Sequence, residues 1–480
     1  MIRRRIVWVL FCSAIAWTVF AGSPSVGAAQ AKPAMKPASA AAPSKAEATV
    51  RPLHLNIQPH QLANGLHVLM VEDRSAPVIN LQVWYHVGSK DEKPGRTGFA
   101  HIFEHMMFKG SAHVGPDEHS RIIEAAGGFD NAYTNDDVTV YWQTFPSNCL
   151  ERVIWLEADR LGSLNVDEAN FKSEREVVKE ERRVGVENRP YGRVFEDLAD
   201  AAFTVHPYKH TTIGSMDDLN KATLEDVRSF HRTFYRPDNA TMVIVGDFVA
   251  SQAVAWVEKY FSGIPKPAAP IPRVTVQEPP QTTERRFSKW YGSESPLPAI
   301  IEAYHMSAEF TLDSYPLILA SNILSGGESS RLYRQLVYKD QVALQTAGIG
   351  NFTEHPNLFL AFAVLNPGKS VPDGEKALQG VLDDMRTAPV SAEELQKAKN
   401  QQISSDILGR VTDQEKADAI GRAAVIGRDP NLVNTSLEQF LRVTPADIQR
   451  VAKEYLDPSH RTIMLIEPPK AEAKQGGNNQ

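Results

Sequence analysis

The chain has 480 residues, of which 42% are hydrophobic, and its formal net charge at pH 7 is −7. This length and apolar content are ample for two domains with cores of their own. The acidic balance argues against a nucleic-acid-binding protein, and it gives no sign of a polybasic patch for membrane surfaces.

The first 29 residues have the parts of a secretory signal peptide. Three arginines precede an apolar run from Ile6 to about Ala21, and small residues at Val26-Gly27-Ala28 offer a cleavage site. We therefore expect an exported, periplasmic protein with no stable membrane insertion once the signal is removed. The alternative is an uncleaved anchor that tethers the protein to the membrane, although this apolar run is short for a bilayer crossing.

An Ala/Pro/Lys-rich stretch over residues 30–50 predicts a flexible tether. Cys12 lies inside the apolar run of the signal, so only Cys149 remains after cleavage. One thiol cannot form an internal disulfide, and the fold must therefore rest on its core rather than on cross-links.

A first domain is predicted over residues 51–264. Near its start, Asn64-Gly65 separates Leu62 from the apolar run 66–71, which indicates a β-hairpin. Further on, the glycines at 127 and 128 indicate a turn, and the β-branched and aromatic segment 138–142 indicates a strand.

The pentapeptide His101-Ile102-Phe103-Glu104-His105 is the feature most informative about function. His101 and His105 are four residues apart, so on a helix both imidazoles project from one face. Flanking apolar residues at helical spacing predict that this helix is half buried, and polar groups there need partners. A zinc ion is such a partner, because a catalytic site needs three protein ligands and one open position. The alternative is an amphipathic helix that carries two ordinary histidines.

A third ligand is expected from the charged segment 167–189, which reads as a long helix that Asp167 caps. Helical neighbours of Glu181 include Val177, Val178 and Val184, whereas Glu180 has charged neighbours, so Glu181 is predicted to face inward. Glu174 is one heptad earlier and lies on the same face. We therefore assign Glu181 to the metal and Glu174 to its supporting shell, with Glu180 as a minor alternative ligand.

The end of the first domain recurs later in the chain. The segment from Thr223 through Thr241-Met242-Val243-Ile244 is repeated from Thr444 through Thr462-Ile463-Met464-Leu465, at a constant offset of 221 residues. Such self-similarity predicts two copies of one supersecondary plan, a helix, a proline-containing turn and a strand. A Pro/Thr-rich stretch at 265–285 is the expected linker, followed by a second, metal-free homologous domain at 286–468 and a flexible tail at 469–480.

Both halves mix hairpin signals with long helical patterns. This combination predicts an α+β fold of two homologous domains, each a largely antiparallel sheet covered by helices.

The motif residues resemble those of the pitrilysin/insulinase metallopeptidases, in which H-x-x-E-H inverts the thermolysin-type order. In that family a Glu some 75 residues after the second His is the third ligand, in a segment like E-R-x-x-V-x-x-E. The run 174–181 matches, with 75 residues between His105 and Glu181. The resemblance implies the processing-peptidase-like two-domain fold, a clamshell in which the second half closes over bound peptide, and one Zn²⁺ per chain.

The segment Gly127-Gly128-Phe129-Asp130-Asn131-Ala132-Tyr133-Thr134 also resembles the family pattern G-G-x-x-N-A-x-T. In the family this is the edge strand beside the zinc, to which an extended peptide adds by main-chain hydrogen bonds. The resemblance therefore implies substrate binding by Phe129, Asn131 and Ala132. An ordinary glycine turn into a core strand is the alternative.

These assignments predict a zinc-dependent endopeptidase that cleaves peptides or unfolded polypeptides. Zinc lowers the pKa of a bound water and polarises the scissile carbonyl. Glu104 is then the general base, which takes a proton from that water and passes it to the leaving amine. Ligand chemistry alone leaves manganese or cobalt as alternatives.

One departure from the family concerns its second half, where assisting members carry a segment like L-R-x-x-x-x-L-G-Y. Here Val337 and Leu344 stand where Arg and Tyr would, and neither donates a hydrogen bond. Family members of this length often pair with a metal-free chain that carries those groups, so we expect a heterodimer with such a partner. Arg334 or Tyr338 could substitute only out of register. A catalytically silent, metal-binding scaffold or peptide-holding subunit is the rival function, and the intact Glu104 argues against it.

Overall fold

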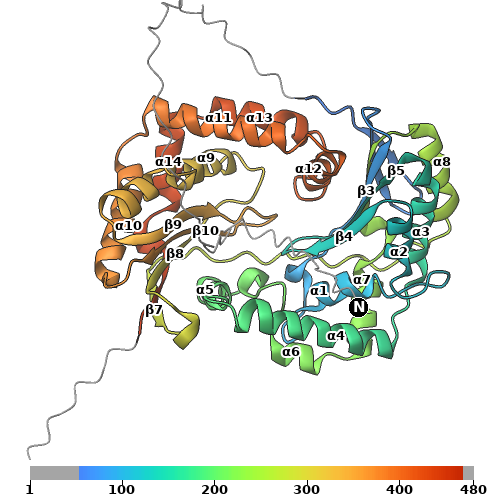
Figure 1. Ribbon diagram of the computed structural model, residues 1–480, viewed down its shortest axis with the longest axis horizontal. Coiled ribbons are helices and arrows are strands. Elements are labelled where there is room, and N and C mark those ends of the chain that lie inside the picture. Colours follow the sequence, from blue (N-terminus) through green and yellow to red (C-terminus); the bar gives the residue numbers. More distant parts are fainter. Residues whose placement is uncertain (1–52, 469–480) are drawn as a thin grey trace, which may run out of the picture. The chain divides into compact units, whose positions relative to one another are not determined.

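The computed structural model describes residues 53–468. The predicted signal peptide, the tether over 30–50 and the tail over 469–480 lie outside these residues. The described part contains two β-sheets, one from strands between 58 and 246 and one from strands between 285 and 466, and helices cover them (Figure 1). No described helix is both long and apolar enough to cross a membrane.

The first sheet has six strands in the order β1-β2-β6-β3-β5-β4. All its pairings are antiparallel except β2 with β6. Its strands are β1 (Gln58–Gln61), β2 (His67–Glu72), β3 (Val78–Tyr85), β4 (Phe129–Thr134), β5 (Thr139–Pro146) and β6 (Ala240–Gly246). The predicted hairpin at Asn64-Gly65 joins β1 to β2, and Gly65 adopts the positive φ of 96° that favours glycine. β4 is an edge strand and pairs only with β5 among the described strands.

Helices of the same part of the chain connect and cover this sheet. They are η1 (Ser89–Asp91), α1 (Phe99–Met106), α2 (Glu118–Ala125), η2 (Ser147–Cys149), α3 (Leu150–Ser163), α4 (Glu168–Arg182), η3 (Arg183–Glu187), α5 (Val194–Ala202), η4 (Pro207–Lys209), α6 (Met216–Lys221), α7 (Leu224–Phe234), η5 (Pro237–Asn239) and α8 (Ala250–Phe261).

The second sheet has five strands in the order β7-β11-β8-β10-β9, antiparallel except for β7 with β11. Its strands are β7 (Arg285–Lys289), β8 (Ala299–His305), β9 (Ala343–Gly350), β10 (Leu358–Leu365) and β11 (Thr462–Ile466). The helices around it are η6 (Gly292–Glu294), α9 (Ser314–Ser325), η7 (Tyr333–Lys339), α10 (Val371–Thr387), α11 (Ala392–Leu408), α12 (Asp413–Val425), α13 (Leu432–Arg442), α14 (Pro445–Tyr455) and η8 (Pro458–His460). The predicted α+β class with two largely antiparallel, helix-covered sheets is confirmed.

The repeated segments fold alike. α7 and α14 each begin at a capping box, in which Thr223 or Thr444 exchanges hydrogen bonds with the Asp three residues later. The short helices η5 and η8 follow at the same offset of 221 residues, and each leads into a buried strand, β6 or β11. The two copies predicted from the sequence therefore form the same helix, turn and strand.

α12 departs from a simple division of the chain at the linker. In sequence it lies between β10 and β11 of the second sheet, yet it packs on β3 and β6 of the first sheet. Its buried residues share a core with Trp84 and with Val243 and Val245 of β6; they are Ala417, Ile420 and Ala423. Gly421 allows this approach, because a Cβ at that position would lie 2.1 Å from Trp84 Cε2. Residues 53–468 consequently form one compact unit.

The segment predicted as a linker contains no helix or strand between Phe261 and Arg285. Side chains hold it at several points. Arg236 donates to the carbonyls of Pro267 and Ala269 at 2.6 and 2.7 Å, and Arg273 donates to the carbonyl of His86 at 2.8 Å. This segment is thus fastened to the first half of the chain near its start, whereas Gln281 donates to the Arg461 carbonyl of the second half at 2.7 Å.

Candidate metal centre

α1 carries the H-x-x-E-H motif and is held by its apolar side. Its hydrophobic residues enter the core of the first sheet, as the 3.6-residue spacing predicted. The buried ones are Phe99, Ile102, Phe103 and Met106. Tyr141 of β5 fixes the helix further, because its hydroxyl donates to the Phe103 carbonyl at 3.0 Å. α1 lies beside α4 and β4 (Figure 1).

The structure brings His101, His105 and Glu181 together, with one potential ligand atom of each within 4.8 Å of the others. Glu181 Oε2 lies 3.6 Å from His101 Nε2 and 3.5 Å from His105 Nε2. It is the only such cluster of three or more His, Cys, Asp or Glu found among residues 53–468. Two helices that are distant in sequence, α1 and α4, supply its members.

The donor set and spacing fit a zinc ion. Bonds of about 2.0–2.1 Å that meet at a tetrahedral angle hold two ligand atoms about 3.4 Å apart. Both Glu181 distances are close to this value. Two imidazole nitrogens and one carboxylate oxygen also form a ligand set typical of catalytic zinc, with a fourth position left for water or substrate. His101 is suited to binding as a neutral ligand, because burial and neighbouring His105 hold its pKa well below the usual value.

Glu174 lies behind His105, on the face of α4 that it shares with Glu181. Its Oε2 is 3.4 Å from His105 Nδ1, while its Oε1 is 3.2 Å from Lys109 Nζ. Burial disfavours the charged carboxylate, but His105 and Lys109 outweigh this and lower the pKa of Glu174. Burial likewise disfavours a charged His105, yet Glu174 and Glu181 raise its pKa to about 10. A carboxylate on the far nitrogen orients a ligating histidine.

Lys109 was missed in the sequence. It lies beyond the end of α1 at Met106, in a turn that brings its ammonium to Glu174, so helical spacing gave no signal for it.

The reason given for the inward orientation of Glu181 was partly wrong. Val178 is buried, but Val177 and Val184 are 39% and 62% exposed and do not mark an apolar face. The single long helix expected over 167–189 is also divided, because α4 ends at Arg182 and a π-helical turn, η3, follows. Asp167 does cap α4, accepting the Asn170 N–H at 2.8 Å. What turns Glu181 inward is the packing of α4 on α1.

Glu180, the alternative ligand, points away from the cluster. Its side chain is 63% exposed and pairs with Arg183 at 2.9 Å on the surface of the helix. The side chain of Glu181, in contrast, is 18% exposed. The structure therefore favours Glu181 over Glu180 on burial as well as on distance.

Glu104 lies on α1 between the two histidines and contacts β4. Burial raises the pKa of its carboxyl, and hydrogen bonding to Thr134 together with the neighbouring His105 partly opposes that shift. A carboxyl with a raised pKa accepts and returns a proton more readily near neutral pH than an exposed glutamate does. Thr134 is the last residue of β4, so Glu104 stands at one end of the edge strand.

The three residues expected to bind substrate all lie on β4. Asn131 and Ala132 are half buried, and the Asn131 side-chain oxygen accepts the Ala132 N–H at 2.9 Å. Phe129 begins the strand, is 52% exposed, and meets Trp142 edge-on at 5.8 Å between ring centroids. At about 3.3 Å per residue, Phe129 stands roughly 17 Å along the strand from Thr134. Of the three residues on β4, Phe129 is therefore the one most distant from the candidate metal ligands.

The second-half segment that departs from the family pattern spans η7 and the start of β9. Leu336 is buried, whereas Tyr338 and Leu344 are 78% and 54% exposed. Arg334 is exposed as well. No described contact joins any of these side chains to His101, His105 or Glu181.

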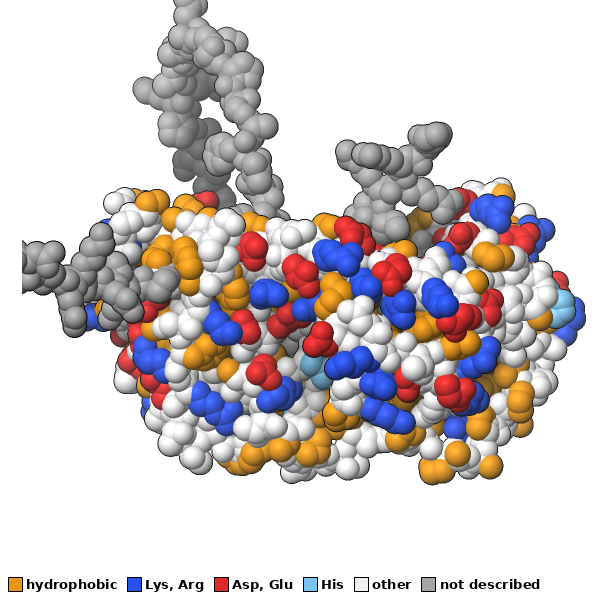
Figure 2. All heavy atoms as spheres, turned by 90° about the horizontal axis from the view of Figure 1, so that it is seen from below, with side chains coloured by type: hydrophobic (Ala, Val, Ile, Leu, Met, Phe, Trp, Pro, Cys, Tyr) orange, Lys and Arg blue, Asp and Glu red, His pale blue; other side chains and the backbone are white. Residues whose placement is uncertain are grey.

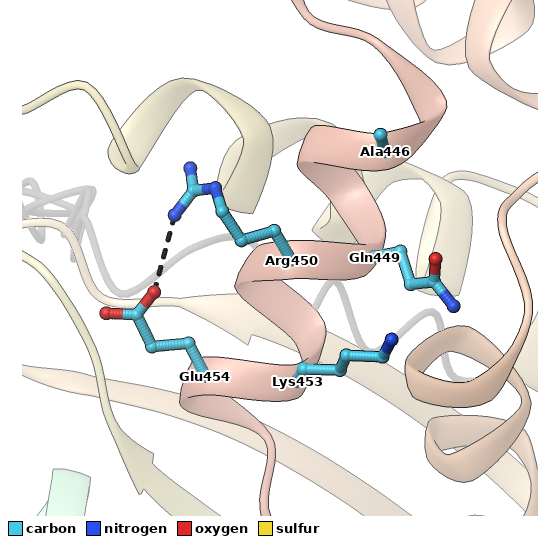
Figure 3. A pocket seen from close by; sticks show the side chains of 5 residues that line it. All are labelled: Ala446, Gln449, Arg450, Lys453 and Glu454. Carbon is cyan, nitrogen blue, oxygen red and sulfur yellow. Dashed lines mark hydrogen bonds and ion pairs between the residues drawn. The ribbon is translucent and has the colours of Figure 1, made fainter.

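In the other hollows of the described surface, no potential ligand side chains from separate elements meet. One is lined by Ala446, Gln449, Arg450, Lys453 and Glu454, all from the single helix α14 (Figure 3). Two of its charged members form a surface pair, Arg450 with Glu454 at 3.3 Å, and Arg450 also pairs with Asp313 at 2.6 Å. On the face seen in Figure 2, basic and acidic side chains are interspersed and form no large patch of one sign.

Comparison with known proteins identifies the family to which the chain is similar. Residues 67–216 match the family model described as Insulinase (Peptidase family M16), and residues 221–402 match the one described as Peptidase M16 inactive domain. The zinc protease PqqE of Helicobacter pylori is 30% identical over 409 residues, which cover 85% of this chain and 92% of that protein.

Solved structures agree in fold. A crystal structure of a protease from Helicobacter pylori has a TM-score of 0.82 at 30% identity and covers 86% of this chain and 100% of that chain. The first half of the periplasmic protease PqqL from Escherichia coli has a TM-score of 0.71 at 18% identity, with coverage of 86% and 93%, and it shows the fold alone. The three candidate ligands, the two sheets and these similarities lead to one conclusion: the chain belongs to the insulinase family of peptidases, family M16.

Proposed function

We propose that this protein is an exported zinc-dependent endopeptidase, with His101, His105 and Glu181 as metal ligands and Glu104 as general base. The observation that carries the proposal is the meeting of the three ligand atoms from α1 and α4, at spacings suited to one tetrahedral ion. The similarity to a chain named as a zinc protease supports zinc as the metal.

When bound, zinc supplies a Lewis acid that polarises a peptide carbonyl and makes a water more acidic. The protein's own side chains carry out the proton transfers. Glu104 removes the proton from the attacking water and delivers it to the leaving amine, so that one carboxyl serves as base and then as acid. Its raised pKa matches this exchange.

β4 is the proposed docking edge for substrate. An extended peptide laid along Phe129–Thr134 as an added strand would meet Glu104 at the Thr134 end. Main-chain hydrogen bonds do not depend on the side chains of the bound peptide. Such a site therefore accepts peptides or unfolded segments of varied sequence. Phe129, at the far end of the strand, would contact a residue about five positions from the scissile bond.

A partner subunit is proposed to complete the site. Val337 and Leu344 occupy the positions at which assisting members carry Arg and Tyr, and no described contact brings the exposed Tyr338 or Arg334 to the cluster. A homologous metal-free chain that carries an Arg/Tyr pair would supply donors for the developing oxyanion. The similar structure from Escherichia coli is described as the first half of its protein, which is in keeping with two such units acting together.

Export is proposed from the signal-like segment at residues 1–29. The name of the Escherichia coli protein as a periplasmic protease is in keeping with it. Mass analysis of the mature protein from a fractionated native host tests this point, because cleavage after Ala28 or Ala29 and retention of the N-terminal segment give different masses.

The function is tested by incubating the purified chain with an unstructured peptide, with and without the candidate partner and a chelator. We expect cleavage that needs metal, that returns when zinc is added back, and that is strongest with the partner. Full activity of the chain alone would contradict the partner. Metal binding without any cleavage, even with the partner, would favour the silent scaffold instead.

A further inference from the structure

The helix that carries the H-x-x-E-H motif begins without a cap of its own. Its N-cap residue, Gly98, has a left-handed φ of 91° and no side chain that could bond the first-turn N–H groups. A larger residue does not fit there, since a Cβ would lie 2.9 Å from both the Ile213 carbonyl oxygen and Leu219 Cδ2. The usual capping residues, Ser, Thr, Asp and Asn, are therefore excluded at this helix start.

Glu92 supplies the cap from outside the helix. Its Oε2 accepts the Gly98 N–H at 2.9 Å, and its Oε1 accepts the Ala100 N–H at 2.8 Å. Both carboxylate oxygens are thus used, and the side chain has no exposed surface. Burial raises the pKa of the Glu92 carboxyl well above its usual value, and the hydrogen bonds from the Ala100, Gly98 and Phe99 N–H groups oppose that shift, as the helix dipole does.

The capped residues directly precede the first metal ligand. Ala100 is followed by His101, and Glu104 and His105 lie one turn further along α1. The two hydrogen bonds, made to N–H groups two residues apart, fix both the position of the helix along its axis and its rotation. Rotation of α1 by one residue, about 100°, would turn both imidazoles away from Glu181.

The segment between Glu92 and the helix is itself anchored. Thr97 Oγ1 donates to Asp218 at 2.7 Å, and the same hydroxyl accepts the Ser215 N–H at 2.9 Å. The segment that leads from Glu92 into α1 is therefore tied to the start of α6, and this holds the backbone between Glu92 and the helix in place.

We propose that Glu92 is a positioning residue for the metal centre, which sets the first turn of α1 so that His101 and His105 meet Glu181. This inference rests on the proposed function, since it concerns the same metal ligands. It predicts that loss of the Glu92 carboxylate weakens metal binding in protein that is otherwise folded.

The test compares zinc affinity, measured by competition with a chromophoric chelator, in wild type, Glu92→Gln and Glu92→Asp. In Glu92→Gln the amide NH₂ faces one of the two backbone N–H groups, so only one cap bond survives. We expect zinc binding to weaken about 10-fold or more, as for other groups that orient ligands. Glu92→Asp keeps the carboxyl group but is too short to reach both N–H groups, and an intermediate affinity is expected.

Glu278→Gln is the matched control. Glu278 also accepts backbone N–H groups from a separate segment, those of Thr204, Val205 and His206, at 2.6, 2.9 and 2.8 Å. It has no contact with α1 among the described hydrogen bonds. This variant should lower the melting temperature of the metal-free protein and leave its zinc affinity at the wild-type value.

Wild-type zinc affinity in Glu92→Gln would overturn the role of Glu92 and leave the proposed function standing. Failure of the wild type itself to bind zinc would contradict the proposed function, and the positioning role with it. If Glu92→Gln gives no soluble protein, Glu92→Asp decides by the same criterion: weaker zinc binding supports the role, and unchanged binding contradicts it. Equal weakening in Glu278→Gln would also contradict it, because the effect would then be general loss of stability.

Discussion

The two nitrogens of the His105 imidazole face two carboxylates of one helix, with Glu174 Oε2 3.4 Å from Nδ1 and Glu181 Oε2 3.5 Å from Nε2. Glu174 and Glu181 are one heptad apart, so both lie on the face of α4 that meets α1. The ring is thereby held with one nitrogen toward the proposed metal position and the other against a supporting acid.

Glu174→Gln should weaken zinc binding by about 10- to 100-fold, because the amide no longer holds the His105 ring as an ionised acceptor. Chelator competition measures this. Glu180→Gln is the control on the same helix, since the Glu180 side chain is 63% exposed and pairs only with surface Arg183. Equal zinc affinity in the two variants would contradict the supporting role of Glu174.

Glu104→Gln should lower peptidase turnover by about 10²- to 10⁴-fold while metal content stays at the wild-type level. The amide keeps the shape of the side chain but cannot take up the proton from water. Turnover is measured with the unstructured peptide and the candidate partner present, and zinc content by atomic absorption. Wild-type turnover at full metal content would rule out Glu104 as the base.

Zinc binding should release about one proton at pH 7. In the metal-free protein Glu174 and Glu181 raise the pKa of His105 to about 10, so the ring carries a proton at neutral pH that zinc must displace. Below that pKa the apparent affinity therefore rises with pH, by roughly tenfold per unit for one proton. Calorimetry in buffers of different ionisation enthalpy counts the proton, and heats that do not depend on the buffer would contradict this account.

Asp73→Asn should destabilise the protein by about 1 kcal/mol at pH 7, because solvent screening of this partly exposed carboxylate reduces the value that its pKa shift alone implies. Lys416 of α12 holds the pKa of Asp73 down to about 2, by hydrogen bonding and by charge. A depressed carboxylate pKa adds stability above the unfolded-state value of 3.8, and this is lost as pH falls toward 2.

Urea unfolding of Asp73→Asn and wild type at pH 7 and at pH 3 measures this difference, which should shrink at the lower pH. Asp200→Asn is the control, because the Asp200 side chain is 71% exposed in its pair with Lys209. A gap that is constant with pH would mean that the Asp73 charge is not the cause.

Local patterns in the sequence were sufficient for much of the fold and site. Helical spacing placed His101 and His105 on one face and Glu174 with Glu181 on another, and the repeat from Thr223 and Thr444 gave two matching helix, turn and strand units. These features depend on residues close in sequence, where the geometry of a helix or turn leaves few choices.

What the sequence did not give depends on distant packing. Glu92 looks like an ordinary surface charge until Gly98 and the first turn of α1 are brought to it. Similarly, nothing local shows that α12 crosses to the first sheet, where Gly421 meets Trp84. The exposed Val177 and Val184 show the converse, since apolar neighbours in sequence did not form a buried face.

The central claim is that one zinc ion is held by two imidazoles of α1 and one carboxylate of α4. Anomalous diffraction at the zinc absorption edge, from crystals grown with zinc, tests it most directly. We predict one strong peak per chain, about 2.0–2.2 Å from His101 Nε2, His105 Nε2 and a Glu181 oxygen. A peak at other residues, or no peak while these three side chains point apart, would contradict it.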